Sequence, residues 1–442
     1  MHNTDMTTES DVTISGRLTT AWRTGPLGVR SFRLLAGGQF TSTIGDFCYA
    51  VALPWLVLSN HGSPALLGLI LACYGIPRMA LIPVGGVLAD KVGPRTLMLC
   101  ADAGRCAVVV ALTVLASRHT SSLAALGPPS ALIGAGEGLF LPASFSIIPS
   151  LVDEGQLAAG NSLSTAITSA GSLLGPALGG ALVAITGAST AAFGVDAVSF
   201  AVSALTLALI PRRAAPGSPA SETDDGSGGE SALGVLLRAP ALLVVLAVVV
   251  AANLGSSGMD AVAIPSLAHA KWGAAGFGAL LACASAGGLI GSLAAARTGR
   301  LRMPTLFTAA VAGMAIAFCL VPYVGEAGAA AAMLVIGACT GLANVVVLTV
   351  VHKQIPAAVL GRVMSAFMLC AFGSYPLSVL VAGLIVRHLG PAPYFPVAGA
   401  MLAVVMIAGL TQRGFRRFGT GAGTVQGLRR ARSRKNGVDT HS

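Results

Sequence analysis

The sequence predicts an all-α membrane protein with about twelve transmembrane helices. Hydrophobic residues make up 54% of the 442 residues and charged residues only 10%, whereas a soluble protein carries about 25% charge. The mean hydropathy is correspondingly high, at +0.80. Apolar stretches of about 20 residues, the length of one membrane crossing, recur between residues 33 and 412.

The predicted elements follow one another with short connections. Residues 1–30 carry Asp5, Glu9 and Asp11 and no apolar core, so they are predicted to form a cytoplasmic tail and not a cleavable signal peptide. The apolar stretches then place the spans near residues 33–58, 64–88, 96–117, 123–148, 160–185, 190–210, 240–265, 276–297, 304–324, 328–351, 363–387 and 393–412.

The midpoint of the chain interrupts this apolar pattern. Residues 211–238 are rich in Pro, Gly, Ser and acidic residues, which is typical of a flexible cytoplasmic linker. Six spans lie on each side, which predicts an N-terminal bundle over 31–210, a C-terminal bundle over 239–412 and a basic cytoplasmic tail over 413–442.

The two halves also echo one another in sequence. IGAGEGL at 133–139, in the fourth span, recurs as IGACTGL at 336–342 in the tenth. A weaker echo sets GGVLADKVGPR at 85–95 beside IGSLAAARTGR at 290–300, where Ala295 stands in place of Asp90. Chance similarity between helices rich in Gly and Ala is the alternative explanation.

The net charge of +10 is distributed unevenly between the connections. Lys and Arg gather in one set of connections and in the tails, and the opposite set holds only Arg118, Lys271 and Arg387. The positive-inside rule therefore predicts that both chain ends lie in the cytoplasm. The basic residues are then explained by membrane orientation, and no nucleic-acid partner is expected.

The chain lacks the motifs of an ATP-driven pump or of a metalloenzyme. No G-x4-G-K-[ST] phosphate loop and no HExxH motif is present, and the eight cysteines lie in apolar spans without CxxC spacing. No metal, cofactor or disulfide framework is expected. These observations favour secondary transport over catalysis.

Residues 86–95, GVLADKVGPR, lie between the second and third predicted spans and resemble a family signature. That signature is G-x-L-A-D-[RK]-x-G-x-[RK]-[RK], of the major facilitators, and Thr96 departs from it at the last position. The resemblance implies the major facilitator fold, two pseudo-symmetric six-helix halves with substrate bound between them near the midplane. It also implies that Asp90, Lys91 and Arg95 latch a cytoplasmic gate. For Lys91 and Arg95, a role in membrane orientation alone is the alternative.

Further segments resemble the drug, macrolide and siderophore efflux branch of the major facilitators. These are GQFTSTIGDFCYAVALPWLVL in the first span, LPASFSIIPSLVDEGQLAAGNSL at 141–163, FGVDAVSFAVSAL at 193–205 and KQIPAAVLGRVMS at 353–365. The fifth span matches the G-x3-G-P-x2-G-G part of the antiporter motif, with Ser162 in place of its leading glycine. The matching residues are Gly171, Gly175, Pro176, Gly179 and Gly180. Plain close packing of small residues is the alternative.

Three charged residues fall at a similar depth near the bilayer centre. Asp46 lies about thirteen residues, or about 20 Å, from the cytoplasmic end of its span, and Arg78 and Glu137 lie about as deep. A charge at this depth needs a partner or a water-filled cavity. We expect Asp46 to pair with Arg78, and Glu137 to carry protons or contact a cationic drug, although Asp46 and Glu137 could exchange roles. A purely structural network is the alternative.

Other polar residues in the spans have less specific expectations. Asp102 and Arg105 face one another at i,i+3 and are predicted to be gate or packing charges. Asp196 and Asp260 fall in the outer halves of the sixth and seventh spans. They are expected to be solvated residues at the mouth of the protein or part of an extracellular gate. By this count the second half has no charge at the midplane. Its cavity candidates are Asn253, Asn344 and Tyr375.

The resemblance and the residues together predict a secondary transporter of the cell membrane. It is expected to export small amphiphilic molecules, such as a drug, an antibiotic or a siderophore-like metabolite, by proton antiport and alternating access. It is expected to act as a monomer in the lipid bilayer. A proton-coupled importer and a transporter-like sensor without transport are the alternatives.

Overall fold

The computed structural model describes residues 25–118, 121–211, 240–297, 303–354 and 357–411, and these form an all-helical membrane protein. The predicted linker 211–238 and the two predicted tails lie almost entirely outside the described residues. Ten helices in the described part are long and apolar enough to cross a membrane, and Thr305–Leu320 and Gly373–Leu389 are shorter apolar helices. Each of the twelve predicted spans coincides with a helical segment.

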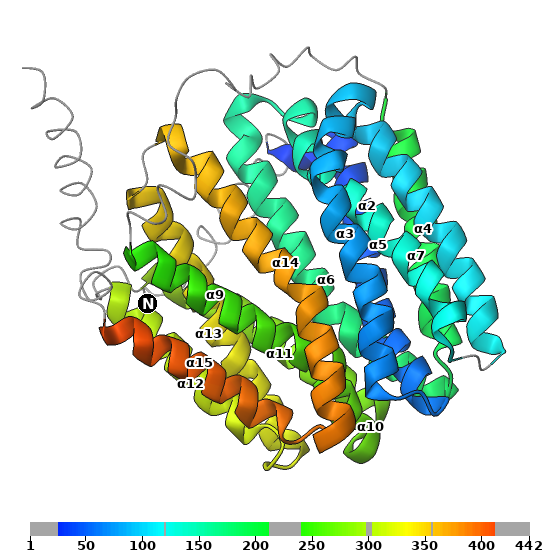
Figure 1. Ribbon diagram of the computed structural model, residues 1–442. Helices are drawn as coiled ribbons and strands as arrows, with labels where there is room; N and C mark the ends of the chain where they lie inside the picture. The colour runs from blue at the N-terminus through cyan, green and yellow to red at the C-terminus, as the bar shows by residue number, and fades with distance from the viewer. Residues whose placement is uncertain (1–24, 119–120, 212–239, 298–302, 355–356, 412–442) are drawn as a thin grey trace, which may run out of the picture.

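The first six spans form one bundle, on the right in Figure 1. Its helices are α2 (Arg30–Ser59), α3 (Pro64–Val92), α4 (Pro94–Ser117), α5 (Leu123–Leu151), α6 (Leu157–Thr186) and α7 (Thr190–Leu209). Short 3-10 turns, η1 (Pro26–Gly28) and η2 (Glu154–Gln156), precede α2 and α6.

The last six spans form the second bundle, on the left in Figure 1. Its elements are α9 (Pro240–Gly258), the π-helical turn η3 (Met259–Ala263), α10 (Ile264–Lys271), α11 (Gly273–Arg297), α12 (Met303–Leu320), α13 (Glu326–Gln354), α14 (Ala357–Leu389) and α15 (Tyr394–Thr411).

The seventh span is longer than the sequence predicts. We expected it to end at residue 265, but α9 continues through η3 into α10 and ends at Lys271. Pro265 does not stop the helix because it directly follows the π-helical turn, where the N–H of Ile264 bonds to the carbonyl of Met259 and the regular α-helical bonding pattern is already interrupted. Asp260 therefore lies eleven residues from the end of the span, a depth of about 16 Å.

The signature segment 86–95 is mostly helical and not a loop. Helix α3 continues to Val92 and α4 begins at Pro94, so Gly93 alone makes the corner. Its φ of +86° lies in a region that L residues with a side chain rarely adopt. Proline then starts α4 in its favoured first-turn position. The corner fixes Asp90 and Lys91 in the last turns of α3.

The internal repeat has a structural counterpart within each half. Helix α5 packs on α3, and α13 packs on α11 in the same way. A Cβ on Gly138 would lie 2.5 Å from the carbonyl oxygen of Arg78, and one on Gly341 would collide with the carbonyl of Gly288. Both glycines occupy the same place in the repeated motif, so the repeat encodes a close approach of two helices.

The halves meet along two seams, α6 against α11 and α3 against α14. In the first seam, a Cβ on Gly180 would lie 2.9 Å from the Cα of Gly278. In the second, a Cβ on Gly68 would lie 2.5 Å from the carbonyl oxygen of Val379. Between the two seams the halves enclose a central cavity.

Candidate functional site

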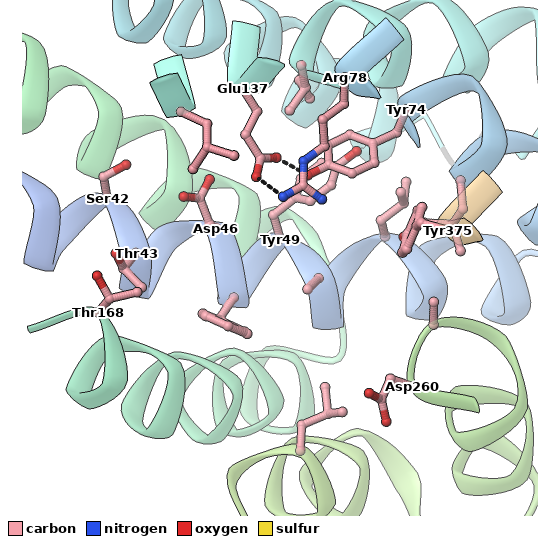
Figure 2. A pocket seen from close by; sticks show the side chains of 18 of the residues that line it. Ser42, Thr43, Asp46, Tyr49, Tyr74, Arg78, Glu137, Thr168, Asp260 and Tyr375 are labelled. Atoms are coloured by element: carbon pink, nitrogen blue, oxygen red, sulfur yellow. Dashed lines mark hydrogen bonds and ion pairs between the residues drawn. The ribbon is translucent and has the colours of Figure 1, made fainter. Parts of the chain in front are cut away.

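The central cavity has a volume of about 610 Å³ and takes its walls from both halves (Figure 2). Most of the wall is apolar, with Leu53, Leu71 and Ile133 among the lining residues. Polar and charged side chains reach into it from several helices: Gln39, Ser42, Thr43, Asp46, Tyr49, Tyr74, Arg78, Arg105, Glu137, Ser144, Thr168, Ser257, Asp260, Ser285 and Tyr375.

Arg78 and Glu137 form an ion pair across the packed helices α3 and α5. Arg78 Nη2 lies 2.9 Å from Glu137 Oε1, and both side chains are partly buried. The hydroxyl of Tyr74, one turn before Arg78 on α3, donates to Glu137 Oε2. Glu137 is therefore held by a cation and a hydroxyl donor together (Figure 2).

The predicted pairing of Asp46 with Arg78 is wrong. The glycine contacts between α3 and α5 place Glu137 directly opposite Arg78, and the sequence gives the depth of these residues but not the rotation of their helices. The cation nearest to Asp46 is Arg105, whose Nη1 lies 3.7 Å from Asp46 Oδ1. The alternative in which Asp46 and Glu137 exchange roles therefore fits the geometry better.

Arg105 is buried and held on several sides. It pairs with Asp102 on the same helix, and its guanidinium carbon lies 4.6 Å and 4.3 Å from the ring centroids of Phe140 and Phe200. Ser203 donates to Asp102 Oδ2 at 2.6 Å. Arg105 pairs closely with Asp102 through Nη2. Its contact with Asp46, from Nη1 to Oδ1, is longer, so Asp46 is only loosely paired. The side chain of Asp46 is 43% exposed, and it lines the cavity.

The three charged residues of the signature segment have different surroundings. The guanidinium of Arg95 donates to the carbonyl oxygens of Leu207 and Ala208, each at 2.8 Å. It thereby satisfies carbonyls at the end of α7, where a helix has no donors of its own. The side chains of Asp90 and Lys91 are exposed and make no ion pair or side-chain hydrogen bond with another described residue.

The antiporter-motif residues of α6 form a seam with two sides. Gly171, Gly175 and Gly179 pack against α2, and Cys48 of α2 contacts the carbonyl oxygen of Gly175. Pro176 and Gly180 instead face α11 of the second half. The motif thus lies where one helix of the first half contacts the second half.

Asp196 and Asp260 are not solvated mouth residues, contrary to expectation. Asp196 is only 1% exposed, because α7 packs between α2 and α4. Asp260 lines the central cavity from η3. The prediction that the second half has no charge at the midplane is also wrong, because the seventh span extends to Lys271 and carries Asp260 deeper.

Of the three polar candidates in the second half, Tyr375 alone lines the cavity. Its ring lies edge-on to that of Tyr74, with the centroids 6.2 Å apart. Asn253 and Asn344, both described, are not part of the cavity wall, and the amide of Asn253 donates to the carbonyl of Val249 in its own helix. The sequence analysis missed Tyr74, although its place one turn before Arg78 could have indicated it.

One end of the cavity is closed by contacts between the halves. Beyond Pro54, the last cavity residue of α2, the ring of Trp55 lies 5.0 Å from that of His269 in α10. Ser59 Oγ lies 3.5 Å from His269 Nε2. This is the end at which α2 finishes and α3 begins.

Comparisons with known proteins support a single family. The family model described as Major Facilitator Superfamily matches residues 35–379. The chain is 28% identical over 388 residues to the uncharacterized MFS-type transporter YfiS of Bacillus subtilis (strain 168), covering 84% of this chain and 90% of that protein. Over 150 residues it is 31% identical to the putative multidrug resistance protein MdtD of Citrobacter koseri, covering 34% of this chain and 31% of that protein.

Solved structures share the fold at low sequence identity. A peptide transporter POT in complex with sulfate matches with a TM-score of 0.71 and 16% identity, covering 88% of this chain and 96% of that chain. A bacterial homologue of the iron transporter ferroportin in an inward-facing state matches with a TM-score of 0.69 and 15% identity, covering 87% and 99%.

Proposed function

The chain belongs to the Major Facilitator Superfamily, whose members are transporters and not enzymes, and from this premise we propose that it exports small amphiphilic molecules in exchange for protons. It is a multi-pass membrane protein and a secondary transporter of a small molecule. The amphiphilic nature of the cargo, the direction of transport and the coupling to protons are what we propose. The observation that carries the proposal is the cavity-exposed carboxylate of Asp46, whose 3.7 Å contact with Arg105 is longer than the contact that Arg105 makes with Asp102.

The cavity wall supports an amphiphilic cargo. Ligand sites with mostly apolar walls and a few polar groups bind molecules of mixed polarity. Leu53, Leu71 and Phe140 supply apolar surface here, and Ser42 and Tyr375 supply polar groups.

Asp46 is the group that we assign to proton coupling. Glu137 is already held by Arg78 and Tyr74, whereas Asp46 faces the cavity with only a 3.7 Å contact to Arg105. Protonation of Asp46 therefore breaks fewer interactions than protonation of Glu137. Arg78 and Glu137 then serve as a fixed pair that contacts the cargo.

Alternating access requires the cavity to open at one end at a time. The halves touch at the end marked by Trp55 and His269, and the exposed Asp90 and Lys91 lie toward the other end. We assign Asp90, Lys91, Arg95, Asp102 and Arg105 to control of that second gate. The distribution of basic residues supports placing it, and both chain ends, on the cytoplasmic side of the cell membrane.

The direction of transport rests on the efflux-type segments and the antiporter motif. The seam made by Pro176 and Gly180 against α11 gives this motif a place at the contact between the halves. The partial similarity to a putative multidrug resistance protein agrees with export. Import and sensing without transport are the competing functions.

Everted membrane vesicles test the assignment of Asp46. Acidification of the vesicle interior should drive accumulation of a fluorescent amphiphile by the native protein. Asp46→Asn should abolish the dependence on the proton gradient, because an amide cannot exchange a proton. Asp153→Asn, at an exposed acid outside the cavity, is the matched control. Gradient-driven accumulation that is unchanged in Asp46→Asn excludes this residue as the coupling group.

A further inference from the structure

The second-half wall of the cavity carries one carboxylate that the proton-coupling network does not use. Asp260 comes from η3, a single π-helical turn inside the seventh span. Such turns are rare and occur often at functional sites, because the extra residue redirects side chains. Figure 2 shows Asp260 on a different helix from the ion pair of Arg78 and Glu137, and well separated from it.

The charge of Asp260 has no counter-charge among the described residues. The ion pairs of the described chain join Arg78 to Glu137, and Arg105 to Asp46 and Asp102. Asp260 belongs to none of them, and its Oδ1 is enclosed without a hydrogen-bond partner. A carboxylate at this depth is costly unless a partner compensates it. The described part of the protein supplies no such partner, and because Asp260 lines the cavity, a cation bound there can pair with it.

The surroundings of Asp260 suit an organic cation. Tyr375 lines the same cavity as Asp260 and lies beside Tyr74. Aromatic faces together with a carboxylate attract ammonium groups, because the ring quadrupole and the negative charge act in the same direction. The apolar remainder of the wall then covers the hydrocarbon part of such a molecule.

We propose that Asp260, with Tyr375, forms a subsite that binds the cationic group of the cargo, a protonated or quaternary ammonium. The inference rests on the proposed function in one respect only, the use of the central cavity as the cargo site. The proposal gives the two acidic residues different roles. Asp46 exchanges protons, and Asp260 makes the cavity selective for positively charged cargo.

The test compares two probe ions of nearly equal shape and opposite charge, tetraphenylphosphonium and tetraphenylborate. Binding of each is measured to the purified full chain in detergent, without a proton gradient. The native protein should prefer the phosphonium. Asp260→Asn should weaken phosphonium binding at least about tenfold, the effect expected when one partner of a buried charge pair is removed. It should not weaken borate binding.

Two further variants separate charge recognition from folding. Asp260→Glu keeps the charge and should retain the preference for phosphonium, and the exposed-acid variant Asp153→Asn should bind both ions like the native protein. Equal phosphonium affinity in the native protein and Asp260→Asn overturns the proposal. Loss of both ions in Asp260→Asn also overturns it, because the residue would then be structural. Because no proton gradient is used, neither result bears on proton-coupled export, which the vesicle experiment with Asp46→Asn tests separately.

Discussion

Arg105 contacts two carboxylates and two aromatic rings on the first-half side of the cavity. It is only 2% exposed and lies between the rings of Phe140 and Phe200. Its pairing with Asp102 compensates a carboxylate that is fully buried. The same guanidinium also sets the environment of Asp46 on the cavity side. One buried cation thus links a structural pair to the proposed coupling group.

Replacing Arg105 should destabilise the protein strongly. Arg105→Gln leaves Asp102 buried without its cation, and breaking a buried pair in this way costs about 3–5 kcal/mol. The apparent Tm of the purified protein should fall by several degrees, and Arg118→Gln, at an exposed arginine, should leave it unchanged. Adding Asp102→Asn to Arg105→Gln should recover part of the loss. An unaltered Tm in Arg105→Gln contradicts the stabilising role of the pair.

The depth of the charged residues could be predicted from the sequence, but their pairing could not. Counting residues from the span ends placed Asp46, Arg78 and Glu137 at one level, and all three line one cavity. Which carboxylate meets Arg78 depends on the rotation of α3 and α5 about their axes. That rotation is set by the glycine contacts between them, and these become apparent only when the helices are packed.

Helix α6 is the element that joins the two halves on one side of the cavity. Its small residues permit backbone contact with α2 through Gly175 and with α11 through Gly180. In a membrane, where lipid is as apolar as Leu, such close packing is a main source of helix association. The antiporter-motif residues therefore lie in the seam between the two halves.

A single added methyl group in this seam should impair transport. A Cβ on Gly180 would lie 2.7 Å from the carbonyl oxygen of Ala274, so Gly180→Ala forces the halves apart. Overpacking of this kind costs about 1–3 kcal/mol. Accumulation in everted vesicles should drop, with a lower apparent Tm. Gly194→Ala, at a helical glycine with open space around it, should be neutral or slightly stabilising. Equal transport by the two variants would show that the seam tolerates a side chain.

The end of the seventh span could not be predicted from the sequence. The apolar pattern placed the end of this span at residue 265, and the structure shows a π-helical turn through which the helix continues to Lys271. Because the predicted span ended too early, Asp260 was expected near the mouth of the protein. No charged residue was therefore expected at the midplane in the second half. The existence of a span follows from composition, whereas a local change of helix type depends on tertiary packing, here of η3 against α14 and α3.

The whole molecule combines two repeated bundles with an unequal distribution of charge. The repeat places Glu137 of α5 and Thr340 of α13 in equivalent positions, and the Thr340 hydroxyl lies within hydrogen-bond distance of the Ile336 carbonyl in its own helix and of the Met314 sulfur. The ion pair therefore belongs to the first half, and among the described residues of the second half Asp260 is the one charged residue that lines the cavity. In the proposals above, Asp46 on the first-half wall exchanges protons, and Asp260 on the second-half wall binds the cationic group of the cargo.

Proteoliposomes that contain only the purified native protein test the central claim, proton-coupled export, most directly. A fluorescent amphiphile is supplied outside, and protein inserted with its cytoplasmic face outward is selected by accessibility of the chain ends. An acidic interior should drive accumulation of the amphiphile against its own gradient, and dissipating the proton gradient should stop it. Flux that is the same with and without the proton gradient, or net movement in the opposite direction, would contradict the account.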